Sequence, residues 1–206
     1  MRRIITFMAC CVLAACASLS KSYPDKSFYA FDVERGESGV RVQAADDAPL
    51  LLVKRFQSGP LNESRTLVYR TGVSTYESDY YNEFFSDPEG LLTVATAAWL
   101  SDSGNFAVLA GSAAGLDPDF VLHGSVRGLY VDMLPEDGPH AIVDLQLVLS
   151  RRRHGLSEPI WRKDFMRSEL AASPSGADVM AAWNRGLADL FAELEVGLET
   201  AIASAE

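Results

Sequence analysis

A short apolar segment near the N-terminus constrains this chain most, because it decides how much of the sequence is left to fold. Residues 4–13 are apolar apart from Thr6, and they follow Arg2 and Arg3. A run of this length is too short to cross a bilayer, which takes about 20 residues. It matches the apolar centre of a secretory signal peptide, which also has a positively charged start. We therefore expect residues 1–15 to be removed as a signal peptide.

The residues at the end of this segment carry a second signal. Leu13-Ala14-Ala15-Cys16 places small residues directly before a cysteine. This order resembles a bacterial lipobox, in which the cysteine is acylated and becomes the first residue of the mature chain. The resemblance implies a covalent diacylglycerol and acyl lipid on Cys16, and two or more acyl chains hold a protein stably on a membrane. An ordinary secretory signal followed by an incidental cysteine is the alternative.

Residue 17 bears on which membrane would hold the anchor. In enterobacteria an aspartate after the lipidated cysteine retains lipoproteins at the inner membrane, and this chain has Ala17. The sorting rule therefore favours the outer membrane, with the domain in the periplasm, over inner-membrane retention.

The composition is that of an ordinary globular protein, with 48% hydrophobic residues, 22% charged residues and a net charge of −10. The acidic balance argues against a nucleic-acid partner and against broad electrostatic adhesion to anionic lipid. Cys10 and Cys11 lie inside the expected signal peptide, so Cys16 is the one cysteine left in the mature chain. No disulfide can then form within that chain.

Hydrophobic patterning predicts a single α+β domain over residues 28–206, with a mixed β-sheet and two main helices packed on it. Residues 16–27 are rich in Ser and Lys and are expected to form a stalk. Strands are predicted where apolar residues alternate or run together between turn signals. These stretches are residues 28–33, 50–56, 66–70, 74–80, 106–109, 120–133, 141–149 and 159–167. Residues 151–155 are predicted to be a turn.

Two segments have helical signals. Either Ser86 or Asp87 would cap a first helix that begins beside Pro88 and ends near Gly104. A second, longer helix is predicted over residues 177–202, because apolar residues recur there at spacings of three or four. They are Met180, Trp183, Leu187, Leu190, Leu194 and Leu198.

The sequence lacks the motifs of common enzyme classes. It has no G-x-S-x-G, Walker A, G-x-G-x-x-G, H-E-x-x-H, C-x-x-C or EF-hand pattern. His123 lies in a predicted strand, whereas His140 and His154 lie at strand ends or turns; a zinc site built from all three and isolated histidines are both open. We expect no catalytic residue, no metal and no cofactor apart from the lipid on Cys16.

Two patches are candidate binding surfaces. The first consists of five aromatic residues within ten positions: Tyr76, Tyr80, Tyr81, Phe84 and Phe85. Aromatic residues anchor interfaces, so these would dock a partner or line an acyl-chain groove, or else fasten the strand and the helix to the core. The second is Arg151-Arg152-Arg153-His154, which would meet an acidic partner or lipid head groups, or simply keep a hairpin tip solvated.

The order of several segments resembles the ABC-type transport auxiliary lipoprotein family, which includes the lipoprotein of the paraquat-inducible system. The resemblance rests on the lipobox, on Phe28-Tyr29, Leu51-Leu52-Val53 and Val68-Tyr69-Arg70, on the aromatic run before a helix, and on residues 119–126 and 181–184. One departure is that the family often carries a tryptophan before the first helix, where this chain has Phe84-Phe85.

This resemblance implies a non-catalytic, outer-membrane lipoprotein that faces the periplasm. It would be an accessory subunit of an ABC/MCE-type system that transports phospholipid or other hydrophobic cargo between membranes. Its partners would be an MCE-domain protein and the ABC permease and ATPase, and the family also suits a homo-oligomeric ring. The alternative is a structural or envelope-assembly lipoprotein scaffold without a transport role. A lipoprotein hydrolase is a third hypothesis, and no motif supports it.

Overall fold

The three longest strands form the continuous part of the sheet. Strands β7 (Phe120–Asp132), β8 (His140–Arg153) and β9 (Leu156–Leu170) pair antiparallel in chain order. In β8, Val143, Leu145 and Leu147 are buried, and the residues between them are partly exposed. This alternation confirms the strands predicted over residues 120–133, 141–149 and 159–167, because one face of each strand packs on the core.

The turn predicted over residues 151–155 is wrong for its first three positions. β8 continues to Arg153, where Arg151 pairs with Glu158 and Arg152 pairs with Ser157 of β9. Cross-strand pairing overrides the polar composition here, and the reversal moves to Gly155, whose φ of 77° favours glycine.

The other edge of β7 is shared by three short strands placed end to end. Strands β2 (Leu50–Lys54), β3 (Gln57–Ser58) and β4 (Thr66–Gly72) each pair parallel with it, in that order along its length. Beyond β2 lies β6 (Ala107–Gly111), and beyond β4 lie β5 (Thr75–Phe84) and then β1 (Ser27–Tyr29). The sheet is therefore mixed. Strand β3, of two residues, was not predicted.

The computed structural model describes residues 25–36, 42–59, 64–113, 115–153 and 155–205. In this part of the chain the nine strands form one mixed sheet with two helices against it, which confirms the predicted α+β domain. Neither helix is long and apolar enough to span a membrane.

Helix α3 (Gly176–Ala203) extends one residue beyond each predicted end, and it packs as its sequence predicts. The Ser175 side chain caps it by accepting a hydrogen bond from the Asp178 amide at 3.3 Å. Trp183 is buried, and its indole N–H donates to the Ile142 carbonyl of β8 at 2.9 Å. The predicted apolar stripe therefore lies on the sheet.

Helix α2 (Pro88–Asp102) has Asp87 at its N-cap position and Pro88 in its first turn, as one of the two predicted arrangements required. The Asp87 side chain makes no capping hydrogen bond. The Asp87 carboxylate instead accepts a hydrogen bond from the Arg55 guanidinium at 2.8 Å, and Arg55 also donates to Glu89 at 3.3 Å. The first turn of α2 is thus tied to the segment between β2 and β3.

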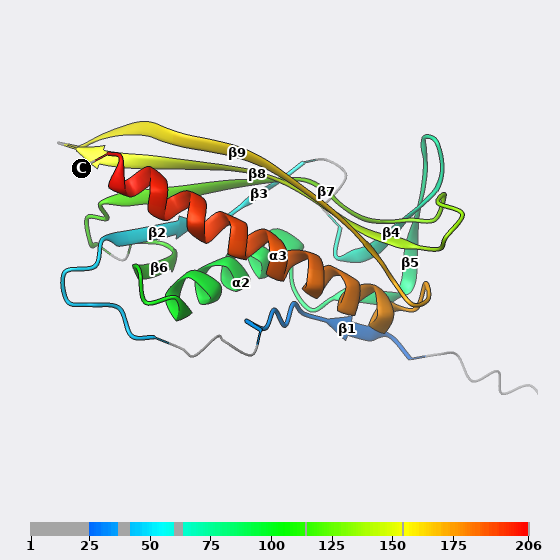
Figure 1. Cartoon of the computed structure of the whole chain (residues 1–206). Helices are drawn as coiled ribbons and strands as arrows, with labels where there is room; N and C mark the ends of the chain where they lie inside the picture. Colours follow the sequence, from blue (N-terminus) through cyan, green and yellow to red (C-terminus); the bar gives the residue numbers. More distant parts are fainter. Residues whose placement is uncertain (1–24, 37–41, 60–63, 114, 154, 206) are drawn as a thin grey trace, which may run out of the picture.

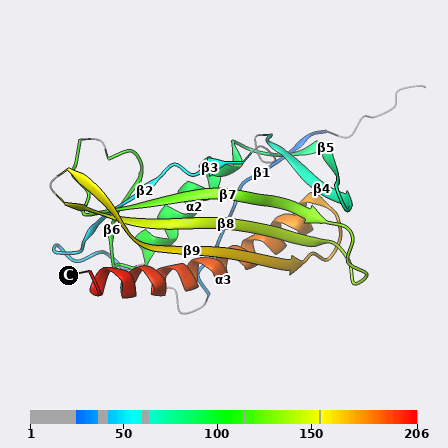
Figure 2. The same cartoon turned by 90° about the horizontal axis from the view of Figure 1, so that it is seen from above.

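Both helices lie on one side of the sheet (Figure 1). Figure 2 looks onto the opposite side, where β7, β8 and β9 lie in front of the helices. This open face carries polar pairs, since the Arg127 Nε donates to Asp144 at 2.9 Å and Gln146 donates to Asp164 at 2.9 Å. The core therefore lies between the sheet and the helices, and the open face of the sheet carries these polar pairs.

Candidate functional site

The lipidation site predicted at Cys16 lies outside the described residues. The stalk is expected over residues 16–27. Its last residue, Ser27, begins strand β1 and so belongs to the folded domain. Lys26 forms an ion pair with Glu83 of β5. The chain therefore enters the domain beside the aromatic run that the sequence marks as a binding surface.

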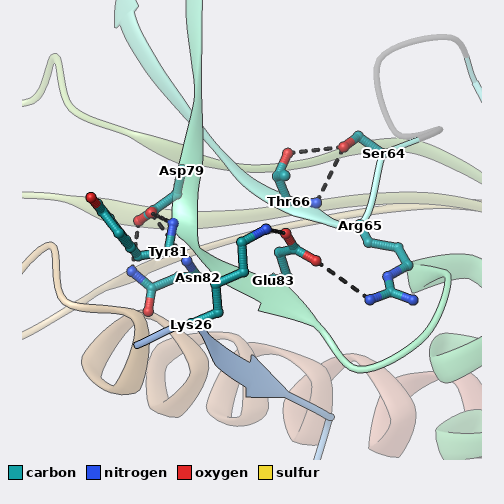
Figure 3. A network of polar contacts seen from close by, with 8 residues as sticks. All are labelled: Lys26, Ser64, Arg65, Thr66, Asp79, Tyr81, Asn82 and Glu83. Carbon is teal, nitrogen blue, oxygen red and sulfur yellow. Dashed lines mark hydrogen bonds and ion pairs between the residues drawn. The ribbon is translucent and has the colours of Figure 1, made fainter. Parts of the chain in front are cut away.

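A large irregularity in the pairing of β4 with β5 divides this aromatic run. Val68 of β4 pairs with Ser78 and Thr66 pairs with Glu83, so residues 79–82 of β5 stand opposite Leu67 alone. The Asp79 carboxylate holds this bulge, because it accepts the backbone N–H of Tyr81 at 2.8 Å and that of Asn82 at 3.1 Å (Figure 3). A short acidic side chain that binds the backbone in this way competes with regular pairing.

The five predicted aromatic residues consequently have different environments. Phe84 is 2% exposed and packs between Phe31 and Trp183, with ring centroids 5.5 and 5.6 Å away. It is a core residue, so it cannot contact a partner in the folded protein. Its burial follows from the pairing of β1 with β5, which turns Phe84 toward α3.

The other four aromatic side chains are exposed or partly exposed. Tyr80 and Phe85 are 70% and 69% exposed. Tyr81 packs edge-to-face on Tyr80 with ring centroids 5.1 Å apart. Tyr76 lies before the bulge and contacts Tyr130 of β7, with centroids 5.7 Å apart. Phe85 follows directly after β5. We call Tyr80, Tyr81 and Phe85 the β5 aromatic set.

Cations flank this set. The Lys26 ammonium lies 4.7 Å from the centroid of the Tyr80 ring, within the range of a cation–π contact. Arg65 approaches Glu83 at 3.4 Å from the other side (Figure 3). The hydrogen bond from Lys26, with the charges of both cations, holds the pKa of Glu83 below its usual value. Glu83 therefore stays ionised between the two cations.

The structure separates the histidines that the sequence left as candidate zinc ligands. His123 pairs with Val148 and His140 with Asp132, so the two lie about 30 Å apart along β7 at about 3.3 Å per residue. His140 contacts Ser168 and Asp137, and His154 lies outside the described residues. Within the described ranges no group of three or more His, Cys, Asp or Glu is placed to hold a metal.

Comparison with solved structures finds this fold in proteins of low sequence identity. Protein XCC0632 from Xanthomonas campestris, a DUF330 protein, matches with a TM-score of 0.68 and 20% identity, over 87% of this chain and 97% of that one. An uncharacterised protein matches with a TM-score of 0.65 and 17% identity, over 84% and 99%. CT253 from Chlamydia trachomatis matches with a TM-score of 0.51 and 12% identity, over 73% and 97%.

The chain shares its fold with XCC0632. No protein-family model matches the sequence, and no curated protein matches it. At these identities the likeness is one of fold.

Sequence reasoning missed the residues that complete the aromatic surroundings. Lys26 falls in the expected stalk and Tyr130 in a strand of the core sheet, yet they contact Tyr80 and Tyr76. These contacts arise because β5 lies between β1 and β4, and β4 also pairs with β7. No local pattern signals contacts over such separations.

Proposed function

We propose that this protein is a lipid-anchored, non-catalytic accessory subunit of an ABC/MCE-type system that moves phospholipid or other hydrophobic cargo between membranes. The observation that carries the proposal is the lipobox-like Leu13-Ala14-Ala15-Cys16, which stands a short distance ahead of a domain with the fold of a DUF330 protein. Ala17 supports the outer membrane as the site of the anchor. The domain would then face the periplasm.

The position of β1 sets the orientation in this proposal. Residues 17–26 extend to at most about 33–36 Å, so the domain stands close to the membrane that holds Cys16. Strand β1 lies toward one end of the molecule and the C-terminal end of α3 lies at the other (Figure 1). The β5 aromatic set therefore faces the anchored end, and the β8–β9 hairpin points away from it.

We assign partner docking to the β5 aromatic set together with Tyr76, and we leave Phe84 out because it is buried. Exposed tyrosine and phenylalanine supply large contact areas with few rotatable bonds. Lys26 and Arg65 add positive charge beside them, in a chain that is acidic overall. The partner would be the MCE-domain protein, with the permease and ATPase joined through it.

Site-specific photocrosslinking in native membranes tests this assignment. A photoreactive phenylalanine is placed at Tyr80 or Phe85 of the full-length protein, and at Val196 of α3 as a control. Val196 is 64% exposed and lies on the C-terminal half of α3, away from β1. Crosslinks to an MCE-domain protein from Tyr80 and Phe85, but not from Val196, are expected.

Two results would contradict the proposal. Crosslinks from Tyr80 and Phe85 to unrelated envelope proteins alone would favour the scaffold hypothesis. A Cys16→Ala variant that is released from the membrane, yet keeps the transport phenotype, would refute the role of the anchor.

A further inference from the structure

A cavity on the open face of the sheet is lined by basic side chains, although the chain carries a net charge of −10. It has a volume of about 410 Å³ and lies over one end of β2, β7, β8 and β9, bounded by the loop after β6 and by the β8–β9 hairpin. Lys54, His123 and Arg152 line it, with Leu52 and Val121 among them. Among the described residues, no Asp or Glu belongs to the lining.

The strand register places these three side chains on the same face of the sheet. Leu52 pairs with Val121, which in turn pairs with Ser150 of β8. Side chains two positions apart in a strand point to the same face. Lys54, His123 and Arg152 each lie two residues from one member of this row, so all three project from the open face of the sheet. Strand β2 is parallel to β7 and β8 is antiparallel to it, so Lys54 and His123 lie on one side of the row and Arg152 lies on the other.

Lys54 and Arg152 carry the positive charge of this lining. Two carboxylates lie on the Arg152 side: Asp117, and Asp119, whose side chain accepts the Leu50 backbone N–H at 2.8 Å. Arg152 meets Asp117 at 3.5 Å, and the Asp117 side chain is 86% exposed, so that ion pair is weak. Within the described residues Lys54 has no ion-pair partner and the His123 ring has no hydrogen bond. Partial burial, and then the charge of Lys54, lower the pKa of His123. The cavity therefore attracts an anion.

We propose that this cavity binds a phosphate group, carried by a small phosphorylated molecule or by a phospholipid head group. Lys54 and Arg152 would hold the phosphate oxygens, since the ammonium and the planar guanidinium are the usual phosphate ligands in proteins. Leu52 and Val121 would contact the carbon part of the ligand. The volume lies in the range of pockets for small organic ligands and exceeds the need of a bare ion. This site follows from the charge and placement of the lining residues and is independent of the proposed transport role.

Titration calorimetry on the full-length protein, purified in a neutral detergent, tests the site with two probes. sn-Glycerol 3-phosphate represents a soluble phosphate ester, and dihexanoyl phosphatidylglycerol represents a head group with its acyl chains. Saturable binding is expected. Lys54→Gln and Arg152→Gln should each weaken the affinity by at least about tenfold, because each substitution removes one hydrogen bond between charged groups.

Arg153→Gln is the matched control. It removes the same charge one residue from Arg152, but its side chain points to the other face of β8 because neighbours in a strand alternate. Binding should change by less than about twofold in this variant, given the screening of a solvent-exposed charge. Melting curves of all variants establish that they are folded.

The outcomes separate the two sources of phosphate. Equal affinity for both probes assigns the site to a soluble phosphate ester, whereas tighter binding of the phosphatidylglycerol assigns it to a lipid head group. In either case the His123 ring resonances, assigned with His123→Gln, should titrate at higher pH with ligand bound, because the phosphate favours the imidazolium. Absence of saturable binding by both probes, or equal weakening in Arg153→Gln, would overturn the proposal.

Discussion

Gly124 lies in the middle of β7 against the ring of Phe56, and its replacement by alanine tests how β7, β2 and α2 are packed. A Cβ at position 124 would lie 2.4–2.6 Å from three atoms of the Phe56 ring. Phe56 cannot move away freely, because it is buried and its backbone N–H donates to the Thr93 hydroxyl of α2 at 2.9 Å. The ring covers the glycine, so the chain has no room for a side chain there.

The expected cost follows from these distances. Carbon atoms in contact normally lie about 3.5–4.0 Å apart, so the ring must shift by about 1 Å. Such overpacking costs about 1–3 kcal/mol, and alanine regains about 0.5–1 kcal/mol because glycine loses more chain entropy on folding. With the middle of each range, Gly124→Ala should therefore lower the free energy of unfolding by about 1 kcal/mol. For a domain of this size that lowers Tm by about 2–4 °C.

Urea unfolding and thermal melts of the full-length protein, followed by circular dichroism, measure this difference. Gly59→Ala is the control, because a Cβ at that position would meet only the Val126 carbonyl oxygen at 3.5 Å, an ordinary contact. A double variant with Phe56→Leu should recover part of the loss, since the shorter side chain leaves space for the methyl group. A coupling energy of about 1 kcal/mol between the two positions is expected.

A Gly124→Ala variant that unfolds at the same urea concentration as the parent and as Gly59→Ala would contradict this packing. Simple additivity of the substitutions at positions 56 and 124 would contradict it as well. The cost would then come from the backbone of β7 and not from the Phe56 ring.

Three further predictions concern the helices and the sheet ends. Trp183→Phe leaves a carbonyl of β8 without its indole donor and should cost about 1–3 kcal/mol in urea unfolding; an unchanged midpoint would contradict this. Ser175→Ala removes the cap of α3 and should cost about 1 kcal/mol, whereas Ser175→Asn should retain it. The hydrogen bond from Arg70 lowers the pKa of Asp132 below its ordinary value of 3.8, so this pair stabilises the fold above about pH 4 and the stabilisation is lost as the pH falls further. Asp132→Asn should therefore lower the stability by about 1 kcal/mol at pH 7, and this difference should shrink at pH 3.

Much of the fold could be predicted from local patterns. The alternation in β7 and β8 and the stripe along α3 are strong because each element buries one face along its whole length. Strand β3 has no such pattern, because two residues are too few to alternate. The predicted turn at residues 151–153 failed because their pairing partners lie in β9, and the polar side chains alone favour a loop.

The sequence by itself determined a short apolar segment ahead of Cys16, an α+β succession of elements, and an aromatic run before the first helix. Only the tertiary structure decided which of those aromatic residues are available. Phe84 and Phe85 are neighbours of the same kind, yet one packs on Trp183 and the other is exposed. The register of β5 with β1 and the bulge at Asp79 set this difference, and both depend on contacts between segments far apart in the chain. The same holds for the cationic cavity. Lys54, His123 and Arg152 are far apart in the sequence, and only the pairing of β2 and β8 with β7 brings them to one cavity.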